Sequence, residues 1–216
     1  MKTIKKAILG LAGVALLASC GNGSTETTEQ NTEAQDQHAS MGTGSHMINT
    51  ENSTVMWKGV MLGVKEHEGT VPFEYGKLEF TDGKITGGEF VADLTAITPT
   101  DENYTEEKPS SMLVGHLESP DFFDVANHPT AKFVITSATE NELKGNLTIH
   151  GNTHEEVATI TNHDTENHTI TTTLKFDRQK YGVAFSTGVK DMVISDEIEL
   201  TVKLAVEADA HTAEAH

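Results

Sequence analysis

Cysteine and arginine are nearly absent from this chain, which has one of each among 216 residues. A single cysteine excludes an internal disulfide and a cysteine-rich metal site. Basic residues are scarce as a class, 15 against 33 acidic ones, so the formal net charge is −18. That charge repels phosphate backbones and anionic membrane surfaces, and it argues against a nucleic-acid-binding protein.

Catalytic motifs are missing as well. The sequence contains no Gly-x-Ser-x-Gly elbow, no phosphate-binding loop, no dinucleotide fingerprint and no cysteine in a nucleophile motif. Acidic residues are so numerous that two carboxylates lying close together would not be evidence for a glycosidase. We therefore expect no enzyme activity, no catalytic residues and no cofactor.

The first twenty residues have the order of an export signal. Lys2, Lys5 and Lys6 precede an apolar run from Ala7 to Ala18, which is too short to span a bilayer as a stable helix. The run ends in Leu17-Ala18-Ser19-Cys20, which resembles the lipobox of bacterial lipoproteins. The resemblance implies cleavage after residue 19, acylation of Cys20, and a membrane-anchored protein of the cell envelope, periplasmic or at the outer membrane.

Two polar segments flank a single domain. Residues 20–47 are rich in Gly, Ser, Thr, Glu and Gln and have no aromatic residue, so they predict a flexible tether. Residues 207–216 are small and polar and predict a disordered tail. The domain between them, residues 48–206, is large enough for one hydrophobic core.

Alternation of apolar and polar residues is the main structural signal in that domain. It is clearest near the end, where Ile198, Leu200, Val202 and Leu204 alternate with polar residues, as in a strand with one face in the core. Turn signals such as Asp82-Gly83 and Gly151-Asn152 separate the segments. The pattern predicts about eight strands, near 53–60, 71–81, 84–93, 131–139, 142–149, 154–162, 167–176 and 196–206.

Short turns between neighbouring segments predict antiparallel pairing. Eight such strands with one apolar face favour an all-β, up-and-down antiparallel barrel, although a two-sheet sandwich fits the same pattern. The exception is the long connection 98–130, in which Ser110-Ser111 could cap a helical turn over Met112–Leu117. Since a loop of this length usually has a function, we interpret it as a lid over one barrel mouth.

Three sequence blocks resemble YceI-like proteins. They are Gly115–Val125 followed by Pro129–Phe133, then Gly145–His154, then Phe176–Gly182. The blocks occur in the family's order across essentially the whole domain. The resemblance implies a lipocalin-like barrel whose apolar interior holds a long-chain lipid, typically a polyisoprenoid, and it does not imply enzyme activity.

The candidate binding residues are apolar side chains of the inner face and the lid. From periodicity alone, a barrel filled by its own side chains is favoured over one with a cavity. With the resemblance, the predicted cavity and lid residues are Trp57, Phe73, Leu78, Phe80, Phe90, Phe122, Phe123, Phe133, Ile135, Leu147, Leu174 and Phe176.

Two polar side chains are candidates for contacting a lipid head group. Arg178 offers several N–H donors to a ligand oxygen, but a structural pair with Asp177, Asp191 or Asp196 is the favoured interpretation. His116 lies in the lid loop, where a surface position is the simpler interpretation. His150 and His154 have a metal-like spacing only on a helix, and a turn signal separates them, so no metal site is predicted.

The sequence thus predicts an envelope protein that binds or carries a polyisoprenoid, a quinone-like lipid or a fatty-acid derivative. The alternative is a membrane-anchored structural or protein-interaction β-domain with a filled core and no lipid. The expected partners are the lipid and the membrane that holds the acyl anchor; formation of a homodimer stays open.

Overall fold

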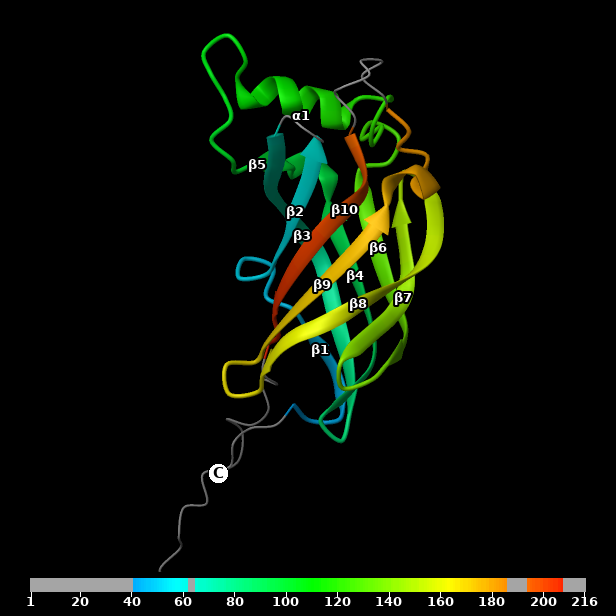
Figure 1. Ribbon diagram of the computed structural model, residues 1–216. Helices are drawn as coiled ribbons and strands as arrows, with labels where there is room; N and C mark the ends of the chain where they lie inside the picture. The colour runs from blue at the N-terminus through cyan, green and yellow to red at the C-terminus, as the bar shows by residue number, and fades with distance from the viewer. Residues whose placement is uncertain (1–40, 62–64, 186–193, 208–216) are drawn as a thin grey trace, which may run out of the picture. The chain divides into compact units, whose positions relative to one another are not determined.

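A closed antiparallel barrel forms the body of the protein. The computed structural model describes residues 41–61, 65–185 and 194–207. In these residues the strand order is β1-β3-β2-β10-β9-β8-β7-β6-β4, and a further pairing of β3 with β4 closes eight strands into a barrel (Figure 1). The barrel strands are β2 (Thr54–Met61), β3 (Lys65–Thr81), β4 (Lys84–Asp93), β6 (Thr130–Ala138), β7 (Glu142–Ile149), β8 (Asn152–Asp164), β9 (Thr169–Asp177) and β10 (Ile194–Ala205).

All eight predicted strands are present, and the barrel prediction is confirmed over the two-sheet sandwich. The largest difference is β3, which begins at Lys65, six residues before its predicted start. Its first half pairs with β2 and its second half with β4. The early part, Lys-Glu-His-Glu-Gly-Thr, is mostly polar, so alternation did not reveal it.

The described domain begins before residue 48. Strand β1 (Gly44–Met47) lies in the segment predicted to be a tether, and it pairs antiparallel with residues 77–80 of β3. His46 is buried there, and its ring meets the Phe80 ring edge-on, with centroids 5.4 Å apart. The tether prediction is therefore wrong for residues 44–47, because backbone pairing and one buried ring order a segment of weak β-propensity. The predicted signal, Cys20, most of the tether and the tail from residue 208 lie outside the described residues.

Two hairpin turns share one backbone geometry. Asp82 and Gly83, between β3 and β4, have φ of 49° and 72°. His150 and Gly151, between β7 and β8, have φ of 51° and 73°. Positive φ at both central residues is the mark of a type I′ turn, which favours Asn or Asp followed by Gly. The second turn thus lies one residue earlier than predicted, because His150 occupies a position where the sequence rule expects Asn, Asp or Gly.

The connection from β4 to β6 covers one end of the barrel (Figure 1). It contains the 3-10 helix η1 (Leu94–Ala96), the short strand β5 (Thr98–Pro99) and helix α1 (Ser110–Glu118). The N-cap of α1 is Pro109, without a side-chain hydrogen bond, so Ser110 and Ser111 do not cap the helix as predicted. Among the described residues, no helix is both long and apolar enough to cross a membrane. We call residues 100–129 the lid segment.

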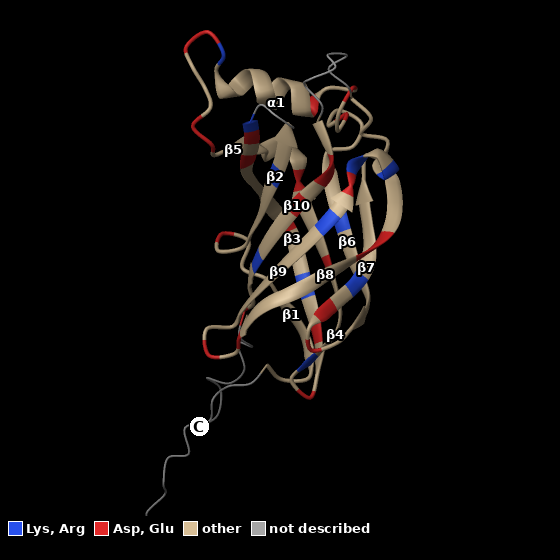
Figure 2. Ribbon diagram, in the orientation of Figure 1, with Lys and Arg blue, Asp and Glu red and all other residues tan. Residues whose placement is uncertain are grey.

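The end of the barrel away from the lid segment is filled by side chains. Leu78, Phe80 and Ile85 are all buried there. On the outside, charged side chains lie along the strands and in the loops, with an acidic group in the loop before α1 (Figure 2). Several pair across neighbouring strands, as Lys58 does with Glu66 and Lys144 with Glu155, at exposed positions where such pairs add little stability.

Candidate functional site

An apolar cavity of about 400 Å³ lies under the lid segment. Its volume is within the usual range of small-molecule pockets, roughly 300–1,000 Å³. The barrel contributes side chains from β2, β3, β4, β6, β7, β9 and β10, and the lid segment contributes Leu113, His116, Leu117, Phe122 and Phe123. The lid segment therefore roofs part of the site, and the barrel forms its walls.

A second cavity of about 100 Å³ lies deeper in the barrel. Five side chains line both cavities and so form a waist between them: Val55, Ala92, Ala131, Ile149 and Leu200. Two of the five are alanines, so the side chains of the waist are small there. We call the two adjacent cavities, taken together from the lid segment toward the filled end, the lipid path.

The predicted cavity residues divide by depth. Trp57, Phe122, Phe123 and Phe176 line the first cavity. Phe73, Phe90, Phe133, Leu147 and Leu174 line the second. The remaining three, Leu78, Phe80 and Ile135, are buried but line neither cavity, because they pack the filled end. Alternation identifies the inner face of a strand, but it does not say how deep along the barrel a residue lies.

Aromatic rings hold the lid segment over the first cavity. The His116 ring lies 5.5 Å from the Phe122 ring and 4.3 Å from the Phe185 ring, both edge-on. Phe122 and Phe123 also pack edge-on, with centroids 4.9 Å apart. Backbone bonds from Phe123 N to Leu117 O and from Val125 N to Glu118 O fold this part back onto α1. His116 thus lies at the cavity wall, on the inner side of the helix.

Trp57 is placed at the cavity wall by a glycine. Its register partner on β3 is Gly69. A Cβ atom on Gly69 would lie 2.5 Å from the Trp57 indole, so only glycine leaves room for this ring. The indole Nε1 is buried and has no hydrogen-bond partner among the described residues. A buried donor of this kind is suited to a ligand oxygen or to a water molecule.

The first turn of the lid segment is tied to β3 by Asp101. Asp101 Oδ2 accepts a hydrogen bond from the Tyr104 hydroxyl at 2.7 Å and lies 3.1 Å from His67 Nδ1. Backbone N–H groups of Asn103 and Glu68 also donate to this carboxylate. His67 in turn lines the first cavity. The network therefore connects the lid segment to the cavity wall.

These contacts shift two pKa values in opposite directions. Burial opposes ionisation of Asp101, but the hydrogen bonds from Tyr104, His67 and the two backbone groups outweigh it and hold the pKa of this carboxyl well below its usual range. Burial, and then the hydrogen bond to the Asp101 carboxylate, raise the pKa of Tyr104. Asp101 is therefore the acceptor and Tyr104 the donor at any ordinary pH.

Arg178 does not reach either cavity. It is buried in the short helix η2 (Arg178–Tyr181), and its five N–H donors match five acceptors. Four are backbone carbonyls, of Val183, Phe185, Ile194 and Ser195, and the fifth is the Asp196 carboxylate. The head-group prediction for Arg178 is corrected accordingly, since no donor is left for a ligand. The aspartate pairing weighed at the sequence level is present as one contact of five.

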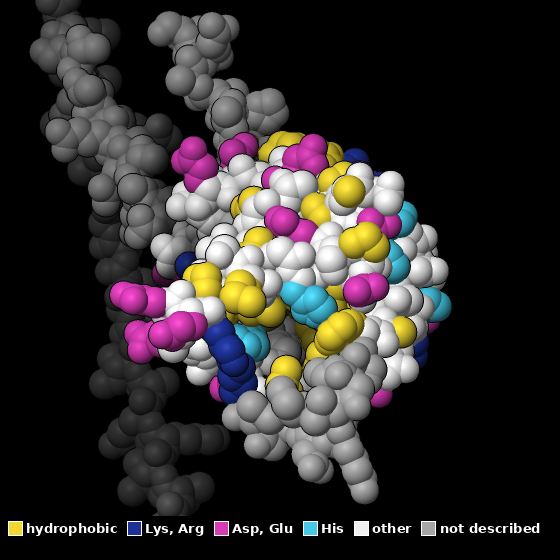
Figure 3. All heavy atoms as spheres, turned by 90° about the horizontal axis from the view of Figure 1, so that it is seen from above, with side chains coloured by type: hydrophobic (Ala, Val, Ile, Leu, Met, Phe, Trp, Pro, Cys, Tyr) yellow, Lys and Arg dark blue, Asp and Glu magenta, His cyan; other side chains and the backbone are white. Residues whose placement is uncertain are grey.

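The polar groups of the path gather at its lid end. His67, His116 and the Trp57 side chain line the first cavity, whereas the second is lined almost wholly by hydrocarbon. Seen from the lid end, hydrophobic and histidine side chains surround a hollow in the surface (Figure 3). The sequence interpretation missed His67 and Phe185, because one lies in a polar stretch and the other beyond the last predicted motif.

Comparison with known proteins gives the family. Two Pseudomonas putida proteins named UPF0312 protein are 28% identical over 154 residues, which is 68% of this chain and 68% of theirs. Burkholderia cenocepacia BcnA superposes with a TM-score of 0.57 at 20% identity, over 74% of this chain and 99% of BcnA. This similarity shows a shared fold. A polyisoprenoid binding domain from Saccharophagus degradans superposes with a TM-score of 0.49 at 12% identity, over 77% and 99% of the two chains.

The match to a protein family covers most of the chain. It begins at His46, within β1, and ends at Val206, directly after β10, so it includes every strand of the closed barrel. Residues 46–206 match the YceI-like domain, and the chain belongs to that family.

Proposed function

We propose that the barrel binds one long-chain apolar lipid, a polyisoprenoid, a quinone-like lipid or a fatty-acid derivative, and that binding rather than catalysis is its function. The observation that carries the proposal is the pair of adjacent cavities with five wall residues in common, both lined mainly by hydrocarbon, with polar side chains at the lid end. A lipid tail gains roughly 25 cal/mol for each Å² removed from water and needs no directed hydrogen bonds. A head group would lie near His67, His116 and Trp57.

The lid segment forms part of the roof of this site. Leu113, Leu117 and Phe122 face the first cavity from three positions in the lid segment. We expect a movement of the lid segment to widen the opening for entry and release of a lipid. The alternative, an interaction domain with a filled core, fits only the end of the barrel away from the lid segment.

The cellular place of this function is proposed from the first twenty residues. The signal-like segment and Cys20 support export and acylation, which would hold the barrel at a membrane of the cell envelope. An anchored barrel could take its lipid directly from that membrane.

Trp57 supplies a direct test, because it is the only tryptophan of the chain and it lines the first cavity. A quinone with an isoprenoid tail should quench its fluorescence saturably at one equivalent, and the same quinone without a tail should not. Leu113→Asp places a charge in the cavity wall and should weaken binding of the tailed quinone at least tenfold, about 1.4 kcal/mol.

The matched control is Met112→Asp, which places the same charge one residue away on the exposed side of α1, where Met112 is 61% exposed. It should bind like the wild type. Equal quenching by the tailless quinone, or equal losses in the two variants, would contradict a tail-binding cavity.

A further inference from the structure

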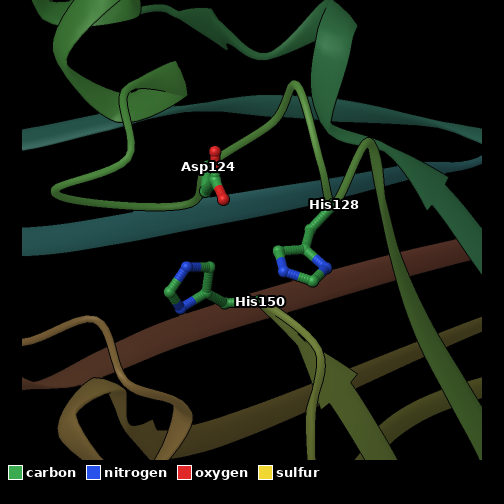
Figure 4. Close-up of side chains that lie close together, drawn as sticks. All are labelled: Asp124, His128 and His150. Atoms are coloured by element: carbon green, nitrogen blue, oxygen red, sulfur yellow. The ribbon is translucent and has the colours of Figure 1, made fainter.

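Three side chains at the rim of the barrel converge from separate parts of the chain. Asp124 and His128 lie in the lid segment before β6, and His150 lies in the β7–β8 turn. One ligand atom from each is within 4.8 Å of the others, and all three side chains are half-buried. Figure 4 shows the carboxylate and the two imidazole rings around a common space. Neither the lipid path nor the packing of the core uses this cluster.

The ring of His150 is held in the tautomer that a metal ligand needs. Its Nδ1 lies 3.2 Å from the carbonyl oxygen of Tyr181, which can only accept. The proton of a neutral ring is therefore on Nδ1, and Nε2 carries the free lone pair. Histidines that bind metals commonly donate their other ring N–H to a backbone carbonyl in this way.

Asp124 is held in a similar manner. The Asn127 side-chain amide donates to both carboxylate oxygens, at 3.1 and 2.9 Å. The backbone N–H of His128 donates to the Asp124 carbonyl at 2.8 Å, which brings the His128 side chain back toward Asp124. Two of the three side chains are thus oriented by groups that do not compete for the space between them.

The backbone around the cluster departs from ordinary turn chemistry. The Asp82-Gly83 turn has the same geometry as the His150-Gly151 turn, but it has the usual aspartate where the latter has His150. A Cβ atom on Gly151 would lie 2.8 Å from the His128 ring, so Gly151 leaves room for that ring as well. His150 in place of the usual Asn or Asp, and the space that Gly151 leaves for the His128 ring, both favour a function for the two histidines beyond forming the turn.

We propose that Asp124, His128 and His150 bind one divalent transition-metal ion. Two imidazoles and a carboxylate suit Zn²⁺, and also Ni²⁺ or Cu²⁺, and they leave one tetrahedral position for water. Neighbouring ligand atoms of a tetrahedral zinc site are about 3.3 Å apart. Small side-chain rotations would therefore bring the three ligand atoms from their observed spacing to the spacing of a zinc site.

The position of the site gives it a consequence for the lid segment. Phe122 lies two residues before Asp124, Ile149 directly precedes His150, and both line the first cavity. A bound ion would join the lid segment to the β7–β8 turn and so hinder opening. This consequence rests on the proposed lipid function, whereas the metal site itself does not.

The test is calorimetric titration of Zn²⁺ into the full chain after treatment with a chelator, without lipid. The wild type should bind one equivalent and should melt at a higher temperature with zinc than without it. His150→Asn gives the turn its preferred Asn-Gly sequence, so the metal-free variant should fold at least as stably. It should nevertheless lose at least about tenfold in zinc affinity, as should His128→Ala.

His154→Asn is the matched control, since this exposed histidine lies four residues beyond His150 and contacts the Lys180 carbonyl instead. It should bind zinc like the wild type. Absence of zinc binding by the wild type, or equal binding by His150→Asn, would overturn the site. A separate measurement of lipid release, slower with zinc in the wild type but not in His128→Ala, tests the consequence for the lid segment.

Discussion

At the scale of single residues, the chain separates packing from binding more sharply than its sequence suggests. Arg178, the only guanidinium, ties Val183 and Phe185 to Ile194 and Ser195, on the two sides of a segment outside the described residues. The composition of the chain made Arg178 conspicuous, but no sequence pattern distinguishes a buried structural arginine from one that contacts a ligand. The difference depends on which carbonyls face it, and that is decided by tertiary structure.

Arg178→Ala should therefore destabilise the fold strongly. It removes five hydrogen bonds and leaves buried carbonyl oxygens without donors, so we expect a loss of about 3 kcal/mol or more in the free energy of unfolding. Urea denaturation followed by Trp57 fluorescence measures it. Asp196→Asn is the control, because the Asp196 side chain is 55% exposed and its loss should cost less than about 1 kcal/mol. Similar losses for both variants would show that the carbonyl contacts add little.

At the scale of elements, periodicity located the strands and failed where polar residues dominate. The ends of β3 and β8 and the whole of β1 were missed, because their order comes from backbone pairing and not from an apolar face. The lid segment was recognised from its length and its two phenylalanines. Its attachment through Asp101 and His67 was not, since these residues are 34 positions apart in the sequence.

The Asp101 network should give the lid segment an acid-sensitive attachment. A carboxyl whose pKa is lowered in the folded protein stabilises it above the unfolded pKa, about 3.9, and this contribution is lost as the pH falls through the folded pKa. Asp101→Asn should thus reduce the free energy of unfolding by a constant amount above about pH 5. Below about pH 4 the difference from the wild type should shrink.

Urea denaturation of both proteins from pH 2.5 to 7 measures this difference. Glu102→Gln, a neighbouring exposed carboxyl, is the control and should change little over the whole range. A difference for Asp101→Asn that grows on acidification would contradict the assigned direction of the pKa shift.

At the scale of the whole molecule, the barrel is a container that is filled at one end and open to a ligand beneath the lid segment. The family and the barrel followed from motif order and alternation, because both depend on local sequence. The cavities did not follow, since empty space depends on the side chains of several strands at one depth. Ala92 and Ala131 look unremarkable in sequence, yet these small side chains form part of the wall common to the two cavities.

The central claim is that a lipid tail lies along this path and passes the waist. Ala131→Met fills the waist while leaving the first cavity open, so it should exclude long tails and still admit short ones. Val157→Met makes the same kind of addition on the outer face of β8, where Val157 is 43% exposed, and should behave like the wild type.

Native mass spectrometry of the full chain, purified from its own cells without exchange of detergent, tests this claim most directly. The wild type and Val157→Met should each carry one long-chain lipid per chain, identified after organic extraction, and Ala131→Met should carry a shorter one or none. A wild-type protein that is folded and empty, or a variant that keeps the same long lipid, would contradict the account.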